Sequence, residues 1–265
     1  MIVSCADKAG PVWRVLLAPD DDGGEVAITA AGIEQFLDLL DEAARAPRCR
    51  ALVLEGSGGC FCRGMSLEEV AAGADTDLGS RRYAACLRHL RGSGKAVIAA
   101  VDGEAIAGGV GLVAAADIAI ATERSSFALP ELMLGLLPAM VLPLLQERMP
   151  AQKARRLAMS TGSVDAARAL EHGLIDRLVR DEAQLERAVR AELKAVLRLH
   201  PTALADLKHH GGRLARADCS VGIDMGADYT VQRLADPRVV DDIRAFIVDG
   251  TPPPWFERYR PAKDS

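Results

Sequence analysis

The sequence has few aromatic residues, no long apolar run and no paired cysteine motif. Aromatic residues make up 4% of its 265 positions, and no stretch reaches the roughly 18 consecutive apolar residues that a membrane-spanning helix needs. The first ten residues, MIVSCADKAG, lack both the basic start and the apolar run of a secretory signal. We therefore expect a cytoplasmic protein that makes no use of a membrane.

The six cysteines do not form a C-x-x-C pair, and Cys60-Phe-Cys62 is too closely spaced for an ordinary structural disulfide or a zinc site. We expect reduced thiols, no metal site and a small buried apolar role for Cys62. Adjacent His209 and His210 point to different faces of a helix and so do not form a metal pair. A net charge of −5 argues against nucleic acid as a partner.

Short apolar strands alternate with helical patterns along the first part of the chain. We predict strands at Val12–Leu17, Ala51–Leu54 and Val97–Val101, a helix over Ile28–Ala44, and helices that begin near Met65 and at Gly108. This alternation indicates an α/β coil with a parallel sheet. An Asp75–Gly79 loop is expected to end at Ser80 as a helix cap. The later part is helical, so we divide the chain into a core at 1–198 and a C-terminal helical region at 199–265.

Two glycine-rich segments each lie between an apolar strand and a helix. The first runs from Glu55 to Gly64, and the second is the Gly108-Gly109 pair. Glycine lets another group approach the backbone closely, and the first N–H groups of a helix have no partner inside it. Such N–H groups can stabilise a developing negative oxygen. Helix capping or close packing by these glycines is the purely structural alternative.

The segments FCRGMSLEEV, IAGGVGL, FALPELMLGLLPA and SVDAARALEHGLID together resemble the crotonase, or enoyl-CoA hydratase/isomerase, superfamily. The resemblance covers nearly the whole chain. It implies an α/β fold with a crotonase-like ββα spiral core and a C-terminal helical trimerisation region. It also implies a homotrimer or hexamer, and an oxyanion hole made by the backbone N–H groups of Met65 and Gly108.

The departures from that pattern carry information about function. Typical hydratases of the superfamily have two glutamates, whereas this chain has Gly111 at the first position and Glu131 at the second. The segment from AGGVGL to LPLL is most similar to the dehydratases of polyketide β-branching cassettes. The resemblance therefore implies a lyase that dehydrates a 3-hydroxy-3-methylglutaryl group on an acyl carrier protein to a 3-methylglutaconyl group.

Three alternatives stay open. Methylglutaconyl decarboxylases of the same cassettes have a tyrosine and a lysine where this chain has Glu69 and Gly73, which disfavours that activity. An enoyl-CoA hydratase/isomerase is the second alternative, and a non-catalytic crotonase-like subunit is the third.

Glu131 is the expected catalytic group, as a base toward the C2 proton and then as an acid toward the leaving hydroxyl. Its structural alternative is a carboxylate that favours a helix start. Tyr83 is the second catalytic candidate, with packing in the core as its alternative. His89 is expected at the surface, and Asp117 is expected to end a helix and orient the next strand.

An arginine should bind the distal carboxylate of a glutaryl substrate, because the guanidinium fork can bind both oxygens. Arg63, Arg81 and Arg82 are the candidates, and the sequence does not choose among them.

Residues 81–95 contain five cations and no acid. We interpret this segment either as a solvated helix face or as a surface that docks an acidic acyl carrier protein through Arg88, Arg91 and Lys95. Ala18 stands where the resemblance implies a basic residue for coenzyme A phosphates. We therefore expect no cofactor and a substrate carried on phosphopantetheine.

Overall fold

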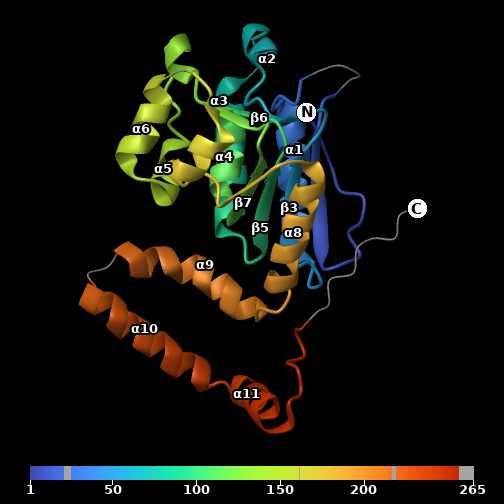
Figure 1. The fold of residues 1–265 in the computed structure, drawn as a ribbon, viewed down its shortest axis with the longest axis vertical. Coiled ribbons are helices and arrows are strands. Elements are labelled where there is room, and N and C mark those ends of the chain that lie inside the picture. Colours follow the sequence, from blue (N-terminus) through green and yellow to red (C-terminus); the bar gives the residue numbers. More distant parts are fainter. Residues whose placement is uncertain (21–24, 74, 161, 217–218, 257–265) are drawn as a thin grey trace.

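Two sheets form the centre of the computed structural model, which describes residues 1–20, 25–73, 75–160, 162–216 and 219–256 (Figure 1). The larger sheet has the order β1-β2-β3-β5-β7-β10 and is parallel except at β1. Its strands are β1 (Ile2–Ser4), β2 (Val12–Ala18), β3 (Ala51–Gly56), β5 (Ala96–Val101), β7 (Ile118–Thr122) and β10 (Arg177–Val179). Every residue of β5 is buried, as a strand covered on both faces requires.

The smaller sheet has the order β4-β6-β8-β9. Its strands are β4 (Cys60–Cys62), β6 (Glu104–Ile106), β8 (Ser126–Ala128) and β9 (Val164–Asp165). The successive pairs β3/β4, β5/β6 and β7/β8 each give one strand to each sheet, and helices connect one pair to the next. This repeat confirms the ββα spiral core.

Helices cover the sheets and leave α4 in the centre of the fold (Figure 1). All eight residues of α4 are buried, which its run of glycine, alanine, valine and leucine permits. Thr29 caps α1, with its hydroxyl accepting from the Gly32 N–H, and the apolar face of α1 packs into the core. The core helices are α1 (Ala30–Arg45), α2 (Leu67–Ala71), α3 (Thr76–Gly92), α4 (Gly108–Ala115), α5 (Leu142–Arg148), α6 (Ala151–Ser160), α7 (Ala166–His172) and α8 (Glu182–Val196).

Two predicted helix starts are wrong. Ile28 does not begin α1, because its backbone forms a bridge with Met65. Ser80 does not cap a helix, because α3 already begins at Thr76 with Asp75 as its cap. The Asp75 carboxylate accepts a hydrogen bond from the Leu78 N–H at 3.0 Å, so most of the expected Asp75–Gly79 loop is helical.

The C-terminal region contains α9 (Pro201–Arg216), α10 (Cys219–Leu234) and α11 (Pro237–Asp249), which extend away from the sheets (Figure 1). Lys208 anchors α9 to the core by an ion pair with Asp117 at 2.7 Å. Asp117 follows the end of α4, as expected, but its carboxylate accepts from the Val97 N–H at 2.8 Å and so holds the earlier strand β5, not the following strand β7. The boundary at residue 198 and the trimer stay predictions.

No helix in the described part of the chain combines the length and the apolar character needed to cross a membrane.

Candidate active site

Three loops meet at one edge of the smaller sheet. Strands β4 and β6 are parallel neighbours, and so are β6 and β8, which places their carboxyl ends on the same side. Met65 lies three residues past β4, Gly108 two residues past β6 and Glu131 three residues past β8. Sites in parallel sheets form where such loops gather. The topology thus brings together the three residues that the sequence identified separately.

The loop that carries Met65 touches the loop that carries Gly108. Gly64 has a φ of +82°, and a Cβ on it would lie 2.8 Å from the Ala107 Cβ and 3.0 Å from the Gly108 nitrogen. Any side chain there would push the two loops apart. The Ile28 N–H donates to the Gly64 carbonyl at 2.7 Å, and the Ser66 N–H donates to the Ile28 carbonyl at 2.9 Å. These bonds hold the first loop on both sides of Met65.

A strained residue orients the Gly108 N–H. Ala107 has φ 50° and ψ −114°, and no other non-glycine residue in the described ranges has a positive φ. Such strain costs about 1–3 kcal/mol and is characteristic of functional sites. Within those ranges, neither the Gly108 N–H nor the Met65 N–H donates to a protein acceptor. Two free N–H groups on touching loops can bind one oxygen.

Glu131 brings an unpartnered carboxyl oxygen to the same edge. It opens the short 3-10 helix η1 (Glu131–Leu134), and its Oε2 atom is buried without a hydrogen bond from any residue that the structure describes. Burial raises the pKa of the Glu131 carboxyl above its ordinary value. A helix of four residues has little dipole to offset this burial. The arrangement therefore favours proton transfer over a purely structural role.

Tyr83 fills the space at Gly111, where the side chain of the first glutamate of a two-glutamate hydratase would start. Its hydroxyl donates to the Gly108 carbonyl at 2.5 Å, and its side chain is buried. A Cβ on Gly111 would lie 2.4 Å from the Tyr83 hydroxyl and 3.1 Å from Val141 Cγ2. Position 111 therefore has room only for glycine while this phenol is present.

The chemistry of Tyr83 follows from this placement. Burial raises the pKa of the Tyr83 phenol well above its ordinary value, and the charge of Glu131 adds to the effect. The phenol is thus a weak acid whose proton is already bonded to Gly108. This geometry suits a residue that positions the Gly108 peptide better than one that delivers a proton.

Two other reactive side chains have no evident part in the site. Cys62 is fully buried, and burial raises its pKa to about 12, so it stays a neutral thiol and packs as expected. Free thiols are found at Cys5, Cys49, Cys60, Cys62 and Cys86, the cysteines whose side chains the structure describes. His89 is partly exposed, with its Nδ1 atom 3.6 Å from an Asp41 oxygen on α1.

Residues 24–231 match the family model described as enoyl-CoA hydratase/isomerase. The chain belongs to this family. The match confirms the predicted superfamily, and it spans both touching loops and Glu131.

Named relatives of this enoyl-CoA hydratase/isomerase family member include two dehydratases. Carnitinyl-CoA dehydratase of Salmonella enteritidis is 31% identical over 84% of this chain and 83% of its own length. The bacillaene synthase dehydratase PksH of Bacillus subtilis is 33% identical over 66% of this chain and 68% of its own length.

Solved structures support the same fold. An enoyl-CoA hydratase/isomerase from Marinobacter aquaeolei superposes with a TM-score of 0.84 and 26% identity, covering 96% of this chain and 99% of that one. AtuE of Pseudomonas aeruginosa gives a TM-score of 0.86 and 26% identity over 97% and 100% of the two chains. These likenesses confirm the crotonase fold.

Each of the three arginines expected to bind the substrate carboxylate forms an ion pair with an acidic side chain of the protein itself. Arg63 pairs with Glu25, and Arg82 pairs with Glu34. Arg81 pairs with Asp77 at 2.9 Å and, unlike the other two, also lines a cavity of about 380 Å³ on α3. The geometry thus gives little support to Arg63 and Arg82.

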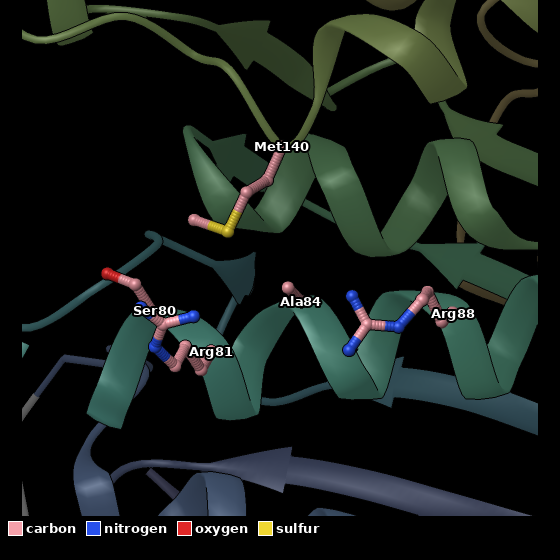
Figure 2. A pocket seen from close by; sticks show the side chains of 5 residues that line it. All are labelled: Ser80, Arg81, Ala84, Arg88 and Met140. Atoms are coloured by element: carbon pink, nitrogen blue, oxygen red, sulfur yellow. The ribbon is translucent and has the colours of Figure 1, made fainter. Parts of the chain in front are cut away.

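The cationic segment 81–95 is not one helix face. Lys95 lies beyond the end of α3, and its ammonium donates to the Ala46 carbonyl at 3.1 Å. Arg91 pairs with Glu147 at 2.6 Å. Arg88 has no acidic partner among the described residues, and it points along α3 into a cavity (Figure 2). Carrier docking by these residues stays a prediction.

Sequence reasoning missed the link between Tyr83 and Gly111. The glycine was identified as a departure and the tyrosine as a candidate acid, but the two lie 28 positions apart in the sequence. Their contact depends on how α3 packs against α4, which no local pattern encodes. An alignment in which relatives change at both positions together would be needed to detect that Tyr83 fills the space left by Gly111.

Proposed function

We propose that this protein is a hydro-lyase that removes water from a 3-hydroxyacyl thioester. The observation that carries the proposal is the unpartnered Oε2 atom of Glu131, at the same sheet edge as the free N–H groups of Met65 and Gly108. A base and two oxyanion donors are the minimum needed to form an enolate at C2 of a thioester. The two dehydratases among the named relatives support the direction of the reaction.

The reaction begins when the thioester oxygen accepts hydrogen bonds from the Met65 and Gly108 N–H groups. The ionised Glu131 carboxylate then takes the C2 proton, and the charge that develops on the oxygen is stabilised by the two donors. Each such donor is worth about 3–4 kcal/mol in comparable sites. The carboxyl then returns its proton to the hydroxyl at C3, the C3–O bond breaks, and water leaves as the C2–C3 double bond forms.

The substrate we infer is a 3-hydroxy-3-methylglutaryl group on the phosphopantetheine arm of an acyl carrier protein, and the product is the 3-methylglutaconyl group. The match to the bacillaene synthase dehydratase supports a polyketide role, although it covers 66% of this chain. Ala18, in place of a basic residue, supports a carrier arm over coenzyme A. No cofactor takes part in this proposal.

The second candidate is dehydration of a coenzyme A thioester. The match to carnitinyl-CoA dehydratase favours it, because that relative aligns with 84% of the chain. The two candidates differ in the carrier of the acyl group and share the roles of Glu131, Met65 and Gly108.

Glu131→Gln tests the shared chemistry, because the amide keeps the shape of the side chain but cannot take the C2 proton. Turnover of the carrier-bound substrate, followed by intact-mass spectrometry, should fall by about 10² or more. The same substrate as a coenzyme A thioester measures the preference between the two candidates. The wild type should process the carrier-bound form with the higher kcat/KM.

Glu104→Gln is the matched control, because Glu104 is a half-exposed carboxylate on β6 that faces Arg63. This variant should keep near wild-type turnover. Unchanged turnover in Glu131→Gln would refute the catalytic role. Absence of turnover by the wild type with both thioesters would instead favour a non-catalytic subunit.

A further inference from the structure

Two adjoining cavities lie between α3, the segment that leads into α5, and α9. The smaller, of about 380 Å³, is lined by Ser80, Arg81, Ala84, Arg88 and Met140 (Figure 2). The larger, of about 610 Å³, shares Ala84, Arg88 and Met140 with the first and reaches Arg213 on α9. Together they form one hollow, which we call the α3–α9 cavity.

The α3–α9 cavity adjoins the two segments that pack over Gly111. Tyr83 and Val141 form the wall over Gly111, and their chain neighbours Ala84 and Met140 line the cavity. Glu131 itself is not among the lining residues. An acyl chain that starts at the oxyanion donors would pass Tyr83 and Val141 to reach this space.

The cavity has an excess of positive charge. Arg81 is paired with Asp77, and Arg91 with Glu147, which is the acid in the lining. Arg88 and Arg213 form no ion pair with any residue that the structure describes. Figure 2 shows the Arg88 side chain turned back along α3 toward Ala84, and both residues line the cavity.

We propose that Arg88 binds the distal carboxylate of the acyl group in the α3–α9 cavity, and so selects substrates that carry an anion at the far end. The inference rests on the proposed dehydratase function. It moves Arg88 from a carrier-docking role to a specificity-determining one, with Arg213 as the neighbouring cation.

The reach of the groups is consistent with this assignment. The Cα atom of Arg88 lies about 7.5 Å along the helix axis from that of Tyr83, whose hydroxyl bonds to Gly108, and the Arg88 side chain folds back over part of that rise. The carboxyl carbon of a glutaryl group is four bonds from the thioester carbon, about 5 Å. Apolar atoms of Leu87, Met140 and Leu144 complete the lining and can cover the methylene and methyl groups between.

The same charges act against a cationic acyl group. A carnitinyl group bears a quaternary ammonium, which proteins usually bind in a cage of aromatic rings. The residues that line the α3–α9 cavity include no Trp, Tyr or Phe, and its unpaired cations would repel such a group. The lining of the α3–α9 cavity therefore favours an anionic acyl group over a carnitinyl group.

Titration calorimetry with two unreactive ligands tests the proposal. The probes are 3-methylglutaryl-pantetheine, which lacks the C3 hydroxyl, and its 5-carboxamide, which has nearly the same shape without the charge. Wild type should bind the acid about tenfold or more tightly than the amide, as expected for a bidentate charged hydrogen bond. Arg88→Met should lose this preference and leave the affinity for the amide within about twofold.

Two further variants make the result specific. Arg45→Met removes an exposed arginine of α1 that pairs with Asp41, and it should behave as wild type. Arg81→Met should keep the preference for the acid. Loss of the preference in Arg81→Met but not in Arg88→Met, an equal loss of both ligands in Arg88→Met, or no preference in wild type would overturn the proposal.

Failure of this inference is distinguishable from failure of the proposed function. Glu131→Gln should be inactive but keep the preference for the acid. An enzyme that dehydrates thioesters without preferring the acid would contradict the role of Arg88 alone. A protein that prefers the acid but dehydrates no thioester would contradict the proposed function alone.

Discussion

The pairing of Tyr83 with Gly111 predicts a large energetic coupling between these two positions. In wild type, Gly111→Ala places a methyl group 2.4 Å from a phenolic oxygen that is fixed by its bond to Gly108 and by the buried ring. Such overpacking costs about 1–3 kcal/mol of folding free energy. In Tyr83→Phe the closest remaining atoms lie at 3.1 and 3.5 Å, so the clash largely disappears. Alanine should then gain up to about 1 kcal/mol over glycine in a helix.

A double-mutant cycle measures this coupling. Urea unfolding at one protein concentration, followed by circular dichroism, should show Gly111→Ala destabilising wild type but not Tyr83→Phe, with a coupling of about 2–3 kcal/mol. Tyr83→Phe alone should cost about 1 kcal/mol for the lost hydrogen bond. Gly92→Ala on α3 is the control, because a Cβ there meets no atom within 4 Å. Additive effects at positions 83 and 111 would refute the steric argument.

Three further predictions concern pH, assembly and docking. Burial raises the pKa of Glu131, so Glu131→Gln should be more stable than wild type at pH 7. This difference in stability should shrink as the pH falls through the folded-state pKa and should vanish below about pH 4. A difference between the two urea midpoints that does not change with pH would contradict the prediction. The C-terminal helices expose apolar side chains, including Ile223, Val231 and Phe246, and we therefore expect a trimer or hexamer. Native mass spectrometry that finds only monomer at micromolar concentration would refute this expectation. Neutralising Arg91 and Lys95 should raise KM for a carrier-bound substrate at low salt but not for a pantetheine thioester; equal effects on both would leave no role in docking.

Much of the fold was accessible from the sequence because its parallel strands are buried runs. Val12–Leu17 and Val97–Val101 coincide with β2 and β5 within a residue at either end. The strands of the smaller sheet were not predicted, since two or three residues such as those of β4 or β9 carry no periodic signal. The start of α1 was misplaced because an apolar residue, Ile28, fits a helix face as well as it fits the bridge to Met65.

The sequence predicted those site residues whose role depends on their own motif. It could not predict those whose role depends on which other side chains they contact in the fold. Met65, Gly108 and Glu131 were identified by motif, and the topology brings all three to one edge. The arginines could not be sorted in the same way, because their availability depends on acids distant in the chain. Glu34 engages Arg82 and Glu147 engages Arg91, whereas no described acid engages Arg88.

The absence of a carboxylate at position 111 also affects the proton chemistry of Glu131. Two neighbouring carboxyls influence each other's ionisation, so each of them can be tuned to one task, base or acid. Here no charged side chain is among the causes that shift the Glu131 pKa, and burial alone raises it. An acyl group that covers the site would bury the carboxyl further and raise this pKa again. A higher pKa makes the protonated form a weaker acid but the ionised form a stronger base, which favours removal of the C2 proton. The single carboxyl is therefore better suited to deprotonation than to protonation, so we expect departure of the C3 hydroxyl to be the more demanding step.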